Sequence, residues 1–65
     1  MQRDEYKDRV IEVRVFRLES GFGWEYQIDG GAPRRSEDRP IDDEEATRKQ
    51  AFIRAKAEID LMDAV

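Results

Sequence analysis

The chain has 65 residues, of which 43% are charged, and it contains no cysteine and no histidine. Disulfides, zinc–thiolate sites, thiol nucleophiles and imidazole general bases are therefore excluded. We expect a non-catalytic protein with no cofactor and no catalytic or metal site. The length predicts a single domain over residues 1–65. Because no long apolar run and no signal-peptide pattern occur, we expect a cytoplasmic protein with no membrane contact.

The net charge is −4, and the charges are grouped along the chain. Residues 1–36 are neutral, with seven basic and seven acidic side chains. Residues 37–47 carry one arginine against six acids, and residues 48–57 carry four basic side chains and no acid. The acidic excess disfavours a general nucleic-acid-binding surface.

The first strand is expected at residues 10–18, after a polar segment, residues 1–8, that we expect to be flexible. Apolar residues alternate with charged ones over 11–15, which is the period of a half-buried strand. Beyond Val15 the phase changes, because Phe16 and Leu18 fall on the opposite face. This change indicates either a bulge near Val15 or a strand end that is apolar on both faces.

Two further strands are expected at residues 24–29 and 32–37. The glycine-rich residues 20–23 predict a turn, and Trp24, Tyr26 and Ile28 then alternate with polar residues. Residues 29–31, Asp-Gly-Gly, predict a tight turn. Pro33 cannot donate a backbone hydrogen bond, which places the third strand at an edge.

A helix is expected over residues 43–62, where neither glycine nor proline interrupts the chain. Asp42 and Glu45 fit a capping box at its start. The whole pattern predicts an α+β fold, in which a two- or three-stranded antiparallel meander packs against one long C-terminal helix. We expect Trp24, Tyr26 and Ile28 to form the core with Val13, Val15 and one stripe of the helix.

The helix carries two apolar stripes on nearly opposite sides. At about 100° per residue, Ala51, Phe52, Ala55, Ile59 and Met62 share one side, and Ala46, Ile53, Ala57 and Leu61 share the other. Either the sheet wraps around the helix and buries both stripes, or the second stripe is an interface. The expected function is a protein-interaction module that binds itself, as a homodimer, or another protein. The candidate interface residues are Ile53, Ala57, Leu61, Phe16 and Leu18.

The alternative function is a nucleic-acid-binding accessory domain that uses a basic sheet face. Arg14, Arg17, Arg34 and Arg35 would form that face and contact phosphates. The acids at 37–45 could suggest a cation site, but they lack the alternating spacing of a calcium loop and fit the start of a helix.

Two segments resemble those of small uncharacterised bacterial ββ(β)α domains. These segments are Gly23-Trp24-Glu25-Tyr26 on a strand and residues 36–46, Ser-Glu-Asp-Arg-Pro-Ile-Asp-Asp-Glu-Glu-Ala, entering an alanine-rich helix. The resemblance implies the fold and a pairing of domains, and it implies no activity. The order of elements also resembles the arm-binding domains of phage integrases, from which the acidic balance of this chain departs.

Overall fold

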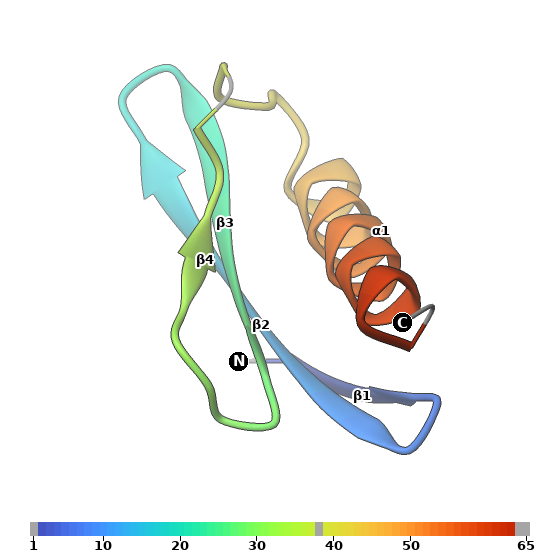
Figure 1. Cartoon of the computed structure of the whole chain (residues 1–65). Helices are drawn as coiled ribbons and strands as arrows, with labels where there is room; N and C mark the ends of the chain where they lie inside the picture. The colour runs from blue at the N-terminus through green and yellow to red at the C-terminus, as the bar shows by residue number, and fades with distance from the viewer. Residues whose placement is uncertain (1, 38, 64–65) are drawn as a thin grey trace.

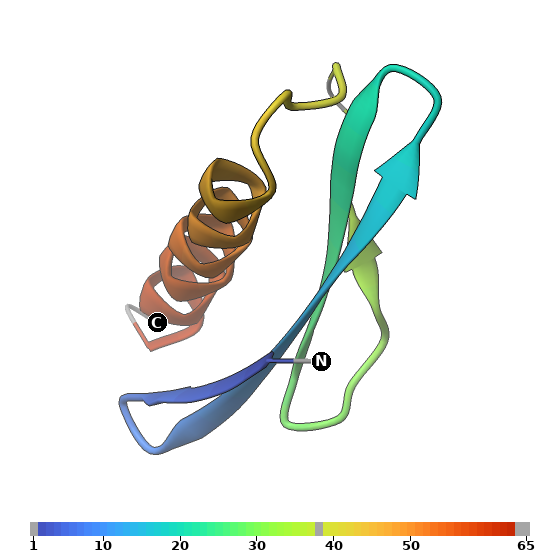
Figure 2. The ribbon, with the colours of Figure 1, turned by 180° about the vertical axis from the view of Figure 1, so that it is seen from behind.

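The structure is a computed structural model that describes residues 2–37 and 39–63. The elements are β1 (Gln2–Tyr6), β2 (Arg9–Leu18), β3 (Gly21–Ile28), β4 (Arg34–Arg35) and α1 (Glu44–Asp63). In the described residues the strands form one antiparallel sheet of order β1-β2-β3-β4. The helix lies along one face of this sheet (Figures 1 and 2). The α+β fold expected from the sequence, a meander packed against a C-terminal helix, is confirmed, but the expected number of two or three strands is wrong because the described sheet has four.

The N-terminal segment forms a strand, so the expectation of a flexible segment at residues 1–8 is wrong for residues 2–6; residue 1 lies outside the described residues. The strand β1 has no apolar alternation, because it is an edge strand and edge strands commonly carry charges. Lys7 and Asp8 join it to β2 with φ angles of 50° and 64°. Two consecutive left-handed residues make a tight hairpin turn, and here the usual glycine is absent.

The two central strands pair without interruption from Ile11 opposite Ile28 to Leu18 opposite Gly21. No bulge occurs near Val15, so the far end of β2 is apolar on both faces. The apolar residues of β2 and β3 that the sequence assigns to the core do lie on the helix-facing side. Ile11, Val13, Trp24 and Tyr26 are buried there, and Val15 and Ile28 are half-buried against them.

The turn between the central strands comprises Glu19 and Ser20, so the prediction of a turn over residues 20–23 is wrong for Gly21 and beyond. Gly23 is needed for packing within β3. A Cβ atom on this residue would lie 2.5 Å from Cε2 of Phe16. The absence of a side chain therefore lets the Phe16 ring lie across the neighbouring strand.

The third predicted strand is shorter than its expected range of 32–37, because only Arg34–Arg35 pair regularly with β3. It lies at the edge of the sheet, as Pro33 requires. The chain then stays beside β3: the Ser36 amide donates to the Trp24 carbonyl oxygen at 2.9 Å, and the Trp24 amide donates to Ser36 Oγ at 3.1 Å. These bonds hold the connection to the helix against the sheet.

The helix begins at Glu44, one residue later than the sequence predicts, and its cap differs accordingly. The Glu45 amide donates to Oδ1 of Asp43 at 3.1 Å, so Asp43 is the N-cap and the predicted box of Asp42 and Glu45 is wrong. Thr47 is fully buried, and its hydroxyl donates to the Asp43 carbonyl oxygen at 2.7 Å.

The core lies between one stripe of α1 and the two central strands. Ala51, Ala55 and Ile59 are fully buried on that stripe, and the two alanines let the helix approach the sheet closely. Beneath them the rings of Trp24 and Tyr26 stack with centroids 5.4 Å apart. Phe52 packs at the margin, whereas Met62, near the end of the helix, is 45% exposed.

Candidate interaction surface

The outward side of α1 carries an apolar stripe that the sheet does not cover. Ile53 is 60% exposed and Leu61 is 73% exposed, and Ala57 between them is also exposed. These three residues, here called the helix stripe, recur every four positions and so lie along one line of the helix. Of the two alternatives that the sequence leaves open, burial of both stripes by a wrapped sheet is therefore wrong.

Charged residues border the helix stripe on both sides. Arg54 and Glu58 lie on one border, and Lys56 and Asp60 lie on the other, because consecutive residues are about 100° apart around a helix. Within the described residues Arg54 forms no ion pair. Glu58, in contrast, accepts a hydrogen bond from Tyr26 and forms an ion pair with Arg34. The stripe is therefore a narrow apolar line between charges of both signs.

One border of the helix is fixed to the first hairpin. The Tyr6 hydroxyl donates to Oδ1 of Asp60 at 2.9 Å, and Lys7 Nζ lies 2.7 Å from the same oxygen. The hydrogen bond from Lys7, together with that from Tyr6, lowers the pKa of Asp60. Lys56 lies over the Tyr6 ring, with Nζ 5.6 Å from the ring centroid. These contacts join the end of β1 and its turn to the helix, although the strand has few apolar residues.

The other border is fixed to the opposite edge of the sheet. The Tyr26 hydroxyl donates to Oε1 of Glu58 at 2.8 Å, and Arg34 Nε lies 3.5 Å from the same atom. Burial, together with the bond to Glu58, raises the pKa of Tyr26 to about 12. Tyr26 therefore stays protonated at neutral pH and acts as a hydrogen-bond donor. Glu58 thus joins the helix to both β3 and β4.

The remaining candidate interface residues, Phe16 and Leu18, lie on the far face of the sheet from α1. The structure therefore places them and the helix stripe on opposite sides of the molecule, so the five residues do not form one surface. Phe16 is half-buried over Gly23, and Leu18 is only 39% exposed. Arg35 also lies over the Phe16 ring, 6.0 Å from its centroid. Most of this apolar area already has contacts within the chain.

The predicted basic sheet face does not form, because strand alternation sends the four arginines to different sides. Arg14 and Arg35 lie on the face away from the helix, with Glu25 between them in register. Arg35 Nε lies 3.1 Å from Oε1 of Glu25. Arg17 and Arg34 belong to the other face. The sequence already contains this signal: Arg14 and Arg17 are three positions apart and Arg34 and Arg35 are adjacent, so strand alternation places the members of each pair on opposite faces.

An open groove of about 480 Å³ lies between β4 and α1. Trp24 and Tyr26 line its floor, and the charged side chains Arg34, Arg54 and Glu58 line its walls. Both aromatic residues are buried, at 5% and 6% exposure, so the floor offers little apolar area. Arg34 and Glu58 pair across it. Among the described residues, no three acidic side chains gather as they would around a metal ion.

In the part of the chain that the structure describes, no helix has the length and hydropathy that a membrane span requires. No protein-family model matches the chain, and neither a curated protein nor a solved structure matches it. The resemblance to small bacterial ββ(β)α domains therefore stays a prediction.

Proposed function

We propose that this protein is a non-catalytic interaction module that forms a homodimer through the helix stripe. The observation that carries the proposal is the exposure of Ile53 and Leu61 on a helix whose other side is packed on the sheet. Leaving large aliphatic side chains in water is unfavourable, and a second protein surface would remove them from it. The other candidate face is weaker, because Phe16 already packs across Gly23.

The chemistry of the side chains supports a non-catalytic role. The chain has no histidine or cysteine, so proton transfer near neutral pH would fall to a carboxylate, a lysine or a tyrosine. Tyr26 lines the groove, but its raised pKa keeps the hydroxyl protonated at neutral pH, so it is not available to accept a proton. The charged groups around it are engaged in pairs between the helix and the sheet. These contacts have a sufficient role in holding the fold together.

The expected dimer is weak, because each copy contributes only two large apolar side chains. Interfaces below about 1,200 Å² of total buried area are typical of transient complexes. We expect a dissociation constant on the order of 10 µM or weaker. The measurement is light scattering on a sizing column, with loading concentrations from about 1 µM to about 1 mM. The mass should approach twice that of the chain at the upper end.

Two substitutions on opposite sides of the molecule identify the surface. Ile53→Asp places a charge on the helix stripe and should leave a folded monomer at every concentration, because Ile53 is not part of the core. Leu18→Asp is the matched control on the far face of the sheet and should dimerise like the natural chain. A monomeric natural chain, or an Ile53→Asp variant that still dimerises, would refute the proposal. Circular dichroism checks that both variants fold.

A further inference from the structure

We propose that the two helices of this dimer run antiparallel, with the two-fold axis beside Ala57; this inference rests on the proposed function. In this arrangement Ala57 faces Ala57 of the partner subunit, and Ile53 faces Leu61 of the partner subunit. Each position is about 6 Å along the helix from Ala57, given a rise of about 1.5 Å per residue. The small side chain at the axis lets the helices approach, and the larger ones pack at both ends.

The charges bordering the helix stripe favour this direction. A two-fold axis perpendicular to the helices brings each border against the same border of the partner. Arg54 then lies about 3 Å along the axis from Glu58 of the partner subunit, and Lys56 lies at a similar offset from Asp60 of the partner subunit. Each of these attractive pairs occurs twice, in addition to the contacts that Glu58 and Asp60 already make with the sheet. Two repulsive pairs have the same offset, Glu58 with Glu58 of the partner subunit and Lys56 with Lys56 of the partner subunit, and each occurs only once.

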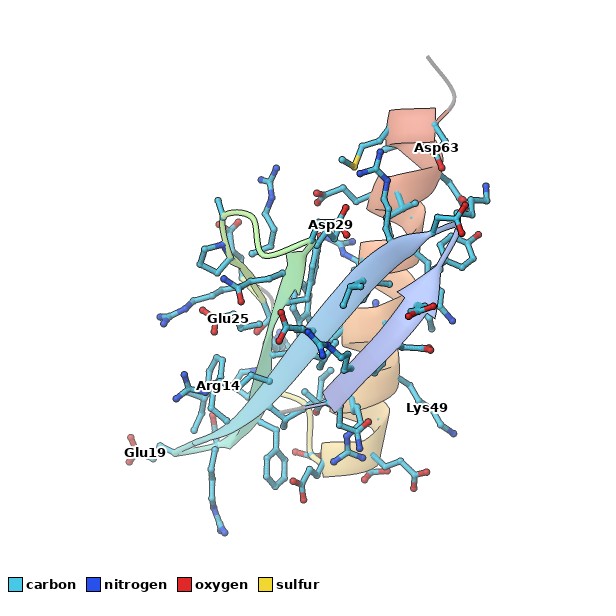
Figure 3. All side chains as sticks on the ribbon, turned by 90° about the horizontal axis from the view of Figure 1, so that it is seen from below. Arg14, Glu19, Glu25, Asp29, Lys49 and Asp63 are labelled. Atoms are coloured by element: carbon cyan, nitrogen blue, oxygen red, sulfur yellow. The ribbon has the colours of Figure 1, made fainter. Side chains whose placement is uncertain are left out.

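A third pair lies further from the axis. Lys49 and Asp63 lie toward opposite ends of α1 (Figure 3). In an antiparallel dimer Lys49 of one subunit therefore lies near Asp63 of the partner subunit. Their offset along the helix is again about 3 Å. Lys49 is exposed and forms no ion pair within the described residues. Asp63 lies 3.6 Å from Arg9 of its own chain, and the long side chain of Lys49 can add a second basic group beside it, which favours the same direction.

A parallel dimer brings opposite borders together and is less favourable. Arg54 would then lie beside Lys56 of the partner subunit, and Glu58 would lie between Lys56 and Asp60 of the partner subunit. Repulsive pairs outnumber attractive ones in this arrangement. Parallel helices also place their dipoles side by side in the same direction, whereas antiparallel helices oppose them. The same surface charges thus distinguish the two directions.

The charge variant Arg54→Glu tests the direction by the sign of its effect. In the antiparallel dimer it replaces two attractions with two repulsions, so the dissociation constant should rise about tenfold and the effect should shrink at high salt. In a parallel dimer it would place the new carboxylate beside Lys56 of the partner subunit and tighten binding. Because Arg54 forms no ion pair within the described residues, the monomer should lose only a little stability, through repulsion between the new carboxylate and Glu58 four residues further along the helix.

Cysteine trapping gives an independent readout, and the natural chain has no cysteine to interfere. Under mild oxidation Ala57→Cys should form a covalent dimer. Ile53→Cys alone should not, because its two copies lie about 12 Å apart along the axis. A mixture of Ile53→Cys with a size-tagged Leu61→Cys should give the mixed dimer. Leu18→Cys on the far face is the control and should remain uncrosslinked.

The outcomes separate the direction from the dimer itself. Covalent dimers of Ile53→Cys alone, with tighter binding by Arg54→Glu, would show parallel helices and overturn this inference while leaving the proposed function intact. A dimer by mass in which none of the stripe cysteines crosslinks would overturn the inference and move the interface elsewhere. A chain that is monomeric at every concentration would overturn both.

Discussion

Two isoleucines on the same helix provide a matched test of its orientation. Ile59 is fully buried on the sheet side, and Ile53 is 60% exposed on the outer side. Replacing either with alanine removes about three methylene-sized groups, worth about 0.8 kcal/mol each when buried, and improves helix propensity by about 0.4 kcal/mol. For Ile59→Ala the residual cavity adds to the loss, so the free energy of unfolding should fall by about 3 kcal/mol. For Ile53→Ala the fall should be about 0.5 kcal/mol.

The assay is urea unfolding followed by tryptophan fluorescence, at a protein concentration where light scattering gives a monomer. A domain of this size has a free energy of unfolding of about 3–10 kcal/mol, so Ile59→Ala could unfold the chain. Ile59→Val, with an expected loss of about 1 kcal/mol, keeps the comparison measurable. Equal losses for the two alanine variants, or a larger loss at Ile53, would refute the assigned orientation of the helix. At high concentration Ile53→Ala should lose additional stability, because the dimer no longer contributes.

Substitutions at three other places test local features of the fold: the Gly23–Phe16 contact, the Tyr26 hydroxyl and the helix cap. Gly23→Ala should lower the free energy of unfolding by about 1 kcal/mol because it displaces the Phe16 ring, but in a Phe16→Ala background it should be neutral or stabilising; a double-mutant cycle with additive effects would contradict this packing. In a Tyr6→Phe variant the tyrosinate absorbance should report the remaining tyrosine, Tyr26, with a pKa of about 12. The stabilising contribution of the Tyr26 hydroxyl should be complete below about pH 10 and should disappear as the pH rises toward 12. Over that range the free energy of unfolding should therefore depend less on pH in Tyr26→Phe than in the natural chain; an ordinary pKa in the folded chain would exclude the bond to Glu58. Asp43→Ala should lower the free energy of unfolding by about 1 kcal/mol through loss of the N-cap, whereas Asp42→Ala should have little effect; thermal melts that rank them in the reverse order would instead support Asp42 as the cap.

The sequence carries much of the fold because the relevant signals are local. Alternation along residues 11–15 and 24–28 predicts which side chains face the core, and the pairing of the two strands places those side chains on one face. The uninterrupted run after Asp43 predicts the helix to within one residue at each end. The two apolar stripes are likewise a consequence of the 3.6-residue period. Ile53, Ala57 and Leu61 can therefore be assigned to one side of the helix by their spacing alone.

The remaining features of the fold depend on contacts between residues that are distant in the sequence. The strand β1 has no periodic signal of its own, and it forms because β2 offers an open edge and Tyr6 reaches Asp60 on the helix. Gly23 has the composition of a turn residue, but the Phe16 ring requires it inside a strand. The choice between a wrapped helix and an exposed stripe depends on which side of α1 meets the sheet. A period along one element fixes which residues share a side, and only packing against another element fixes where that side points.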